Sequence, residues 1–211
     1  AHGFAGKLLL CGDHEIALAG AMQTPGCVLI AGTGSICYGK NAAGEHFRCG
    51  GGGHIIDDPG SGYALGRDAL AAALQTEDGR LSENALHGAV MDTVGGSGIQ
   101  GIFDFVYFSR RGKGDIAALA PLVLRCAAQG DAVSLDILRR GAAELARLVS
   151  AVMGKLGLEN GSPCALAGGL LAEENVYRRA VCAALAPFCR PAAPEHDALF
   201  GAVQLALAAI Q

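Results

Sequence analysis

The sequence predicts an α/β fold in which helices flank a mixed sheet. Three observations support this prediction. Short apolar runs separated by glycine-containing turns between residues 26 and 50 have the length and spacing of antiparallel strands. Helical periodicity fills the stretch from Leu81 to Gly157. After that stretch, an apolar run ends in Gly168-Gly169 and precedes another helical segment, which is the strand-then-helix order of a parallel connection.

The N-terminal part predicts one strand, one helix and a three-stranded meander. Lys7 to Cys11 is expected as a short buried strand, and Asp13 opens a helix that reaches Met22. Thr24-Pro25-Gly26 then breaks the helix. Three further strands are predicted at Cys27 to Ala31, Ser35 to Gly39 and Glu45 to Cys49.

The remaining elements are mainly helical. A loop from Pro59 to Ser61 leads into a helix over about Gly62 to Leu74, and Asp131 is expected to cap a later helix. One apolar stripe of that later helix comprises Leu138, Ala142, Leu145, Val149, Val152 and Leu156. The last predicted elements are a strand at Pro163 to Ala167, a helix from about Glu173 to Leu185, a strand at Phe188 to Arg190 and a helix from Asp197 to Ile210.

Composition excludes several classes of protein. The 211 residues are 51% hydrophobic and 17% charged, which suits a packed core and argues against disorder. The formal net charge is −4 and no run of Lys or Arg resembles a nucleic-acid footprint, so we expect no nucleic-acid partner. No apolar run is long enough to span a bilayer, so we expect no membrane partner.

The eight cysteines do not form a disulfide framework or a metal site in sequence. Most of them lie inside apolar runs: Cys11, Cys27, Cys37, Cys164 and Cys182. No C-x-x-C motif and no zinc-like spacing of His and Cys is present. We therefore expect reduced core thiols, no metal bound by the protein's own side chains, and a cytoplasmic location.

A glycine turn between two predicted strands is the first candidate for chemistry. Gly32-Thr33-Gly34-Ser35 joins two apolar runs and is not followed by a helix, unlike the phosphate loops of Rossmann and Walker sites. Its glycines leave backbone amides accessible and its two hydroxyls add donors, so it could bind phosphate oxygens. A plain hairpin turn would use the same residues.

Two acidic side chains stand beside helix starts. Asp13 could accept a proton from an alcohol that attacks a phosphoryl group, or it could be a helix N-cap. Asp58 follows the glycine run Gly50 to Gly53 and could bind sugar hydroxyls. The pair Asp57-Asp58 could instead indicate a metal site, or only a loop and a cap.

The double glycine Gly168-Gly169 ends a predicted strand. A flat base can pack on such residues because no side chain projects from them. A simple strand-to-helix turn explains the pair equally well.

Taken in order, these segments resemble the N-acetylglucosamine kinase and BadF/BadG/BcrA/BcrD-type ATPase family, which has the actin, sugar kinase and heat-shock ATPase fold. The resemblance covers about Cys11 to Leu207. The matching segments are Gly12-Asp13 with Ala17 to Ala21, Ala31 to Ser35, Gly51 to His54 with Asp58, Gly60 to Arg67, Ala120 to Val123 with Gly130-Asp131, Ala167 to Leu170, and Gly201-Ala202.

The resemblance implies a fold and an activity. The fold would be the ribonuclease H-like second domain of the actin-like ATPases. Residues 1–23 would be the edge of a first domain, 24–196 the second domain with a helical insert at about 75–157, and 197–211 a closing helix. The activity would be ATP-dependent phosphorylation of an amino sugar, with ATP and Mg²⁺ as cofactors, a small-molecule sugar as substrate and a homodimer as the assembly.

The resemblance also assigns roles to residues. Asp13 would be the catalytic base. The phosphates and adenosine would be held by Gly32, Thr33, Gly34, Ser35, Gly168 and Gly169, and the sugar by Gly51, Gly52 and Asp58.

Three departures from the family pattern accompany these matches. No Asp-Gly-Gly-Gly-Thr-type phosphate loop precedes Asp13, so we expect a C-terminal portion with little or no phosphoryl transfer by itself. Gly52 stands where amino-sugar kinases have Trp. Asp57 replaces a usual glycine, and Pro59 replaces a carboxylate and removes an amide donor, which leaves the identity of the sugar open.

Two alternatives belong to other functional classes. Activator ATPases of dehydratases share the fold family and hold an iron–sulfur cluster between subunits, for which this chain has cysteines. A nucleotide- or sugar-binding module without turnover would also fit the departures at Gly52 and Pro59.

Overall fold

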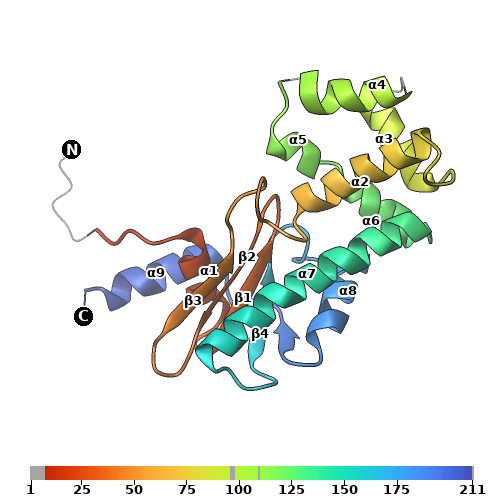
Figure 1. Cartoon of the computed structure of the whole chain (residues 1–211). Coiled ribbons are helices and arrows are strands. Elements are labelled where there is room, and N and C mark those ends of the chain that lie inside the picture. Colours follow the sequence, from red (N-terminus) through yellow and green to blue (C-terminus); the bar gives the residue numbers. More distant parts are fainter. Residues whose placement is uncertain (1–7, 96–97, 109, 211) are drawn as a thin grey trace.

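The computed structural model describes residues 8–95, 98–108 and 110–210, and a five-stranded sheet forms its centre (Figure 1). The strands are β1 Gly26–Ala31, β2 Ser35–Lys40, β3 His46–Gly50, β4 Pro163–Ala167 and β5 Arg190–Ala192, in the spatial order β3-β2-β1-β4-β5. β1, β2 and β3 pair antiparallel, whereas β4 pairs parallel with both β1 and β5. The predicted α/β fold with a mixed sheet is confirmed.

Helices make up most of the remaining structure, and some of them cover the two faces of the sheet. They are α1 Asp13–Ala21, α2 Gly62–Glu77, α3 Ala85–Val94, α4 Gly98–Phe103, the π-helical turn η1 Asp104–Phe108, α5 Lys113–Ala117, α6 Ala120–Ala128, α7 Ala132–Leu156, α8 Val176–Leu185 and α9 Ala198–Ala208. Figure 1 shows α7 and α8 on one side of the sheet and α1 and α9 on the other. Over the described ranges, no single helix is long and apolar enough to cross a membrane. The bent pair Lys113–Ala128 and Ala132–Leu156 reaches the required length and apolar composition only when its two helices are taken together.

Side-chain alternation along β1 divides the core in two. Cys27 and Leu29 face the larger cluster, which lies under α7 and α8, while Val28 faces a smaller cluster with Leu18 and Tyr38. Successive strand residues point to opposite faces, so a strand that is apolar throughout has to be covered on both sides. This pattern explains why β1 lies in the middle of the sheet.

The long helix α7 confirms two predictions from sequence. Its N-cap Asp131 accepts a hydrogen bond from the amide of Ser134 (2.8 Å). All six residues of the predicted stripe are buried: Leu138, Ala142, Leu145, Val149, Val152 and Leu156. α7 packs directly against β1, β2 and β3, whereas the helical insert expected at about 75–157 stays a prediction. The helices from α3 to α6 make up the part that stands away from the sheet (Figure 1).

Two strand predictions need correction. Residues 8–12 have no regular structure, so the strand expected from Lys7 to Cys11 is wrong over these positions, and Lys7 itself lies outside the described residues. The last strand occupies Arg190–Ala192 instead of Phe188 to Arg190, because Cys164 and Pro191 pair in register across β4 and β5. Apolar runs alone did not specify either position.

α1 and α9 pack against each other at very short range. A Cβ atom at Gly201 would overlap the backbone carbonyl of Ile16, and one at Gly20 would overlap the carbonyl of Asp197. The amide of His196 also donates to the Gly20 carbonyl (2.9 Å). The two helices therefore form one unit on their side of the sheet.

The cysteines are free thiols, as predicted. Cys27, Cys37 and Cys164 are buried, whereas Cys11 and Cys182 are partly buried. Burial raises the pKa of the Cys37 thiol well above its usual range. Among the described residues, no group of three or more His, Cys, Asp or Glu could hold a metal ion.

His87 of α3 contacts two carboxylates, one at the end of α2 and one in the loop before α3. From these contacts we predict that the stability of the fold depends on pH. The Nε2 atom of His87 lies 2.7 Å from Glu77 Oε1 and its Nδ1 lies 3.1 Å from Glu83 Oε2. Burial lowers the pKa of His87, but the two hydrogen bonds and negative charges outweigh it and raise the pKa above the ordinary 6.5. The stabilisation is therefore complete below pH 6.5 and lost as the pH rises through the folded-state pKa.

We expect His87→Gln to lower the melting temperature most at acidic pH. Thermal unfolding of wild type and variant between pH 5 and pH 9 measures the difference. A difference that stays constant over this range would show that the imidazolium does not contribute.

Candidate active site

The Gly32-Thr33-Gly34-Ser35 turn joins β1 to β2 and is fixed to the start of α2. The amide of Gly32 donates to the carbonyl of Gly34 (2.9 Å) and closes the turn. The carbonyls of Gly32 and Thr33 accept hydrogen bonds from the amides of Gly62 (2.7 Å) and Tyr63 (3.2 Å), which open α2. Because α2 supplies donors that its own first turn cannot use, it holds the tip of the hairpin in one position.

Three donors of the turn are available for a ligand. Within the described part of the chain, the amides of Thr33 and Gly34 and the hydroxyl of Thr33 have no hydrogen-bond partner, and Thr33 is exposed. Adjacent backbone amides of this kind form anion-binding concavities. The turn therefore has the chemistry expected of a phosphate site at Thr33 and Gly34.

Ser35 has another role in this structure. Its amide donates to Asp58 Oδ1 (3.2 Å) and its hydroxyl donates to the Pro59 carbonyl (2.7 Å), and Ser35 is buried. Both donors are therefore used to join the turn to the following loop. The contact of Ser35 with phosphate stays a prediction, and in this structure Ser35 positions the turn.

Asp58 is the partner that fixes this connection. It is only 4% exposed and has a positive φ of 58°, which Asp and Asn tolerate better than other residues with a Cβ. Its carboxylate lies against Gly34 as well as bonding the Ser35 amide. The residue predicted to bind sugar is therefore also the link between the loop and the phosphate-type turn.

Substitutions of Asp58 separate these contributions to stability. Asp58→Ala removes the acceptor for Ser35 and places an unfavourable residue at positive φ, so we expect a loss of about 2–4 kcal/mol in the free energy of unfolding. Asp58→Gly removes only the acceptor, and Asp58→Asn keeps both an oxygen acceptor and tolerance of positive φ. Denaturant unfolding should rank the losses as Ala, then Gly, then Asn, and an equal loss in all three would exclude the backbone contribution.

The loop before Asp58 is closed by its own hydrogen bonds. The amide of Gly51 donates to the Ser35 carbonyl (2.9 Å), and the amide of Gly52 donates to Asp57 Oδ2 (2.8 Å). At its tip Ile55 and Ile56 are 84% and 86% exposed. Both amides predicted to face a sugar are thus engaged in this structure.

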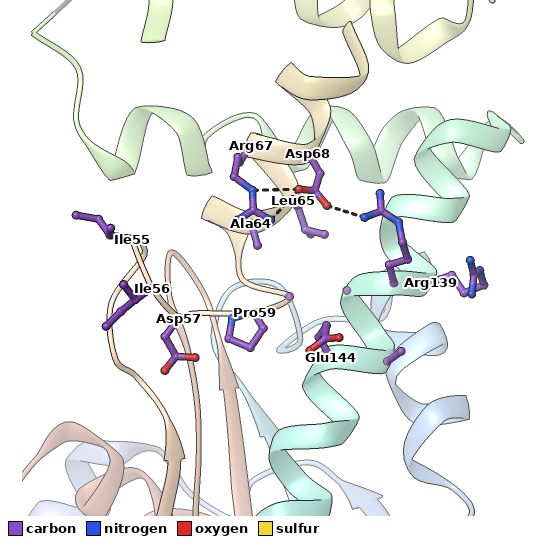
Figure 2. A pocket seen from close by; sticks show the side chains of 14 residues that line it. Ile55, Ile56, Asp57, Pro59, Ala64, Leu65, Arg67, Asp68, Arg139 and Glu144 are labelled. Atoms are coloured by element: carbon purple, nitrogen blue, oxygen red, sulfur yellow. Dashed lines mark hydrogen bonds and ion pairs between the residues drawn. The ribbon is translucent and has the colours of Figure 1, made fainter. Parts of the chain in front are cut away.

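A cavity of about 570 Å³ lies between this loop, α2 and α7 (Figure 2). Its walls combine apolar groups such as Pro59 with ionised ones such as Glu144. Asp68 stands in the middle and binds Arg67 (2.9 Å) and Arg140 (3.1 Å). Every one of these charges has an opposite charge nearby, so the cavity has no excess of either sign.

The double glycine brings the end of β4 against the end of β1. Gly168 has a φ of 87°, and a Cβ atom there would overlap the carbonyl of Ala31. The same carbonyl accepts the amide of Leu170 (3.1 Å). Gly169 differs, because a Cβ at that position meets nothing within 4 Å.

A hollow of about 280 Å³ joins two of the predicted glycine motifs. It is lined by Gly32, Thr33, Gly62, Gly114, Ala117, Ala118, Ala120, Pro121, Gly169 and Leu170. Gly32, Thr33 and Gly169 were predicted from sequence, whereas the wall from α5 and α6 was missed. Two signals for that wall were the small-residue run before Pro121 and the family match of Ala120 to Val123, and neither indicated a ligand site.

Asp13 does not line either cavity, as the described residues define them. It is exposed and occupies the first position of α1, where Gly12 is the N-cap, so the alternative prediction of Asp13 as N-cap is wrong. The neighbouring His14 ring packs edge-on against Tyr38 of β2 (4.7 Å between centroids). Asp13 is not among the described residues that line the hollow or the larger cavity, so its role as a base stays a prediction.

Comparison with known proteins supports a relationship over nearly the whole chain. Residues 4–206 match the model of the BadF/BadG/BcrA/BcrD ATPase family. The chain is 41% identical over 159 residues to an N-acetylmuramic acid/N-acetylglucosamine kinase of Clostridium acetobutylicum, covering 75% of this chain and 52% of that protein. It is 31% identical over 174 residues to an N-acetyl-D-glucosamine kinase of Dictyostelium discoideum, and the match covers 80% of this chain and 53% of that protein.

Solved structures give the same relationship. A candidate N-acetylglucosamine kinase of Chromobacterium violaceum superposes with a TM-score of 0.77 at 33% identity, over 97% of this chain and 67% of that one. One from Porphyromonas gingivalis has a TM-score of 0.67 at 19% identity over 91% and 62%, and this likeness shows the fold alone. The chain spans about half the length of the curated relatives that it matches.

Proposed function

The chain belongs to the BadF/BadG/BcrA/BcrD ATPase family, and we propose that it forms the nucleotide-binding part of a kinase for N-acetylated amino sugars. The observation that carries this proposal is the hollow between the hairpin turn and the double glycine. Thr33 lines it and supplies an amide and a hydroxyl that bond to no other described residue. The two curated relatives reported above are named as kinases of N-acetylmuramic acid and N-acetylglucosamine in one case and of N-acetyl-D-glucosamine in the other.

In this proposal the hairpin turn binds phosphate and the double glycine seats the nucleoside. The amides of Thr33 and Gly34 and the Thr33 hydroxyl hold phosphate oxygens, and Gly169 offers a flat surface to adenosine. Gly168, Ser35 and Asp58 position these groups. Because phosphoryl transfer depends mainly on positioning and charge stabilisation, a rigid turn is the feature that such a site needs.

The transfer step assigned to Asp13 is proton removal. The sugar hydroxyl gives its proton to the Asp13 carboxylate, its oxygen bonds to the terminal phosphorus of ATP, and ADP leaves with the electrons of the broken P–O bond. Since the described residues contain no cluster of three potential metal ligands, we propose that Mg²⁺ enters bound to the phosphates of the nucleotide. It would neutralise phosphate charge there.

For the sugar, the predicted residues Gly51, Gly52 and Asp58 remain our proposal. The amide of Gly52 donates to Asp57, and the amide of Ser35 donates to Asp58. A sugar that binds the Gly52 amide or the Asp58 carboxylate must therefore replace one of these hydrogen bonds with a bond to its own hydroxyl. The absence of an aromatic side chain at Gly52 leaves the ring face of the sugar to other contacts. The exposed Ile55 is close in sequence and is suited to an apolar contact.

The predicted domain arrangement also becomes a proposal. A cavity of about 670 Å³ on α9 is lined by the exposed side chains of Leu8, Leu9, Val203, Leu207 and Ile210, together with Leu205 and smaller residues. The solved relative from Chromobacterium violaceum extends beyond the matched part by about a third of its length. We propose that a further domain of the longer protein covers this apolar face. The homodimer and the cytoplasmic location stay predictions.

The kinase proposal is tested with the product of the complete gene. It is incubated with Mg·ATP and a panel of N-acetylglucosamine, N-acetylmuramic acid, glucosamine and glucose, and ADP release is measured. Turnover on an N-acetylated sugar is expected. Nucleotide binding without turnover on any sugar would favour a binding module, and bound iron after anaerobic purification would favour a dehydratase activator.

A further inference from the structure

The walls of the nucleotide-sized hollow carry almost no side-chain chemistry. Seven of its ten lining residues are Gly or Ala, and among the ten only Thr33 has a side chain that can form hydrogen bonds. Thr33 belongs to the turn, at the end proposed for phosphate. The remaining wall consists of backbone and of the apolar residues Pro121 and Leu170.

Much of the backbone of this wall is also already bonded. The amide of Ala118 donates to Gly114 (2.9 Å), that of Leu170 to Ala31 (3.1 Å) and that of Gly62 to Gly32 (2.7 Å). A ring in the hollow therefore meets mainly small residues, and these three amides are already bonded. Recognition of the groups on the edge of a base would need side chains that this wall does not have.

We propose that the hollow selects a purine by the shape and stacking area of its ring and does not distinguish adenine from guanine or hypoxanthine. This inference rests on the proposed function. An apolar pocket rejects a ligand of similar shape by no more than about 100-fold, whereas a pocket built to bond a polar group rejects a ligand lacking it by about 10,000-fold or more. We therefore expect the dissociation constants of Mg·ATP, Mg·GTP and Mg·ITP to agree within about 10-fold.

Pyrimidines provide the opposite comparison. CTP has the same phosphates but a smaller ring, so it loses stacking area in the hollow. We expect CTP to bind more weakly than each of the three purine nucleotides, and about 10-fold or more weakly than ATP. The titrations are made by calorimetry at one magnesium concentration with the product of the complete gene.

A substitution at Gly169 tests whether the base occupies the hollow. There is room for a Cβ at Gly169, so Gly169→Val keeps the fold while its branched side chain fills the space of the ring. We expect affinity for all three purine nucleotides to fall by 10-fold or more, in the same proportion, and affinity for inorganic tripolyphosphate to stay unchanged. Gly154→Val on α7 is the matched control, because a Cβ there also meets nothing within 4 Å.

The possible failures are distinguishable. If no nucleotide binds, the proposed function and this inference both fail. If ATP binds more than about 10-fold more tightly than GTP or ITP, or if CTP equals ATP, the inference is overturned while the proposed function stands. A loss of tripolyphosphate binding in Gly169→Val would show that the variant disturbs the turn, and Gly169→Ala, which adds only a methyl group, then repeats the comparison.

Discussion

Replacing Gly168 with alanine is expected to lower the free energy of unfolding by about 2–5 kcal/mol. The left-handed backbone at this position, with a φ of 87°, costs a residue with a Cβ about 1–2 kcal/mol. The new methyl group also overlaps the carbonyl of Ala31, and such overpacking costs about 1–3 kcal/mol. Neither group can move away easily, because Ala31 pairs with Ser35 in β1–β2 and its carbonyl also accepts the amide of Leu170.

The neighbouring glycine is the control for this prediction. Gly169→Ala adds the same methyl group where nothing lies within 4 Å, so its effect should stay within about 0.5 kcal/mol. Denaturant unfolding of both variants measures the difference. Equal losses would contradict the close approach of β1 and β4, and with it the shape of the hollow that Gly169 lines.

The elements that sequence predicted well are those determined by local pattern. The apolar stripe of α7 repeats every three or four residues, and the N-cap Asp131 marks the start of the helix. Both features are recognised from the local sequence, without knowledge of the elements that pack against α7. The hairpin of β1 and β2 is similar, because Gly32 and Gly34 interrupt a continuous apolar run.

The errors occur where a partner decides the structure. Residues 8–12 are apolar enough for a strand, but an isolated apolar run becomes a strand only when another strand pairs with it. Pairing with β4 likewise moved the last strand to Arg190–Ala192. Periodicity likewise identified α7 as a helix, but it could not show that α7 lies on β1, β2 and β3.

In the candidate site, too, features set by the local sequence were predicted, and features set by distant residues were not. The glycine motifs were found because glycine has a distinctive conformational role, and the structure brings Thr33 and Gly169 to one hollow. Sequence could not show that Ser35 and Asp58 bond each other, because they are separated by 23 positions. The wall from α5 and α6, including Ala118, is made of residues that carry no chemical signal of their own.

Replacing Asp13 with asparagine is expected to lower kcat for sugar phosphorylation by about 100- to 10,000-fold in the product of the complete gene. This range is the usual contribution of a general base. Asparagine has the same shape and cannot accept the proton of the sugar hydroxyl, so the barrier to transfer rises. The affinity for nucleotide should not change, since Asp13 is not among the described residues that line the hollow.

The controls separate catalysis from folding. Asp13 is exposed at the first position of α1, where loss of its charge weakens the interaction with the helix dipole by only about 0.3–1 kcal/mol. Asp92→Asn, at another exposed aspartate in α3, should leave kcat unchanged. A kcat for Asp13→Asn within threefold of wild type would exclude Asp13 as the base. In that case the reacting hydroxyl would have to find its proton acceptor among other residues of the longer protein or in solvent.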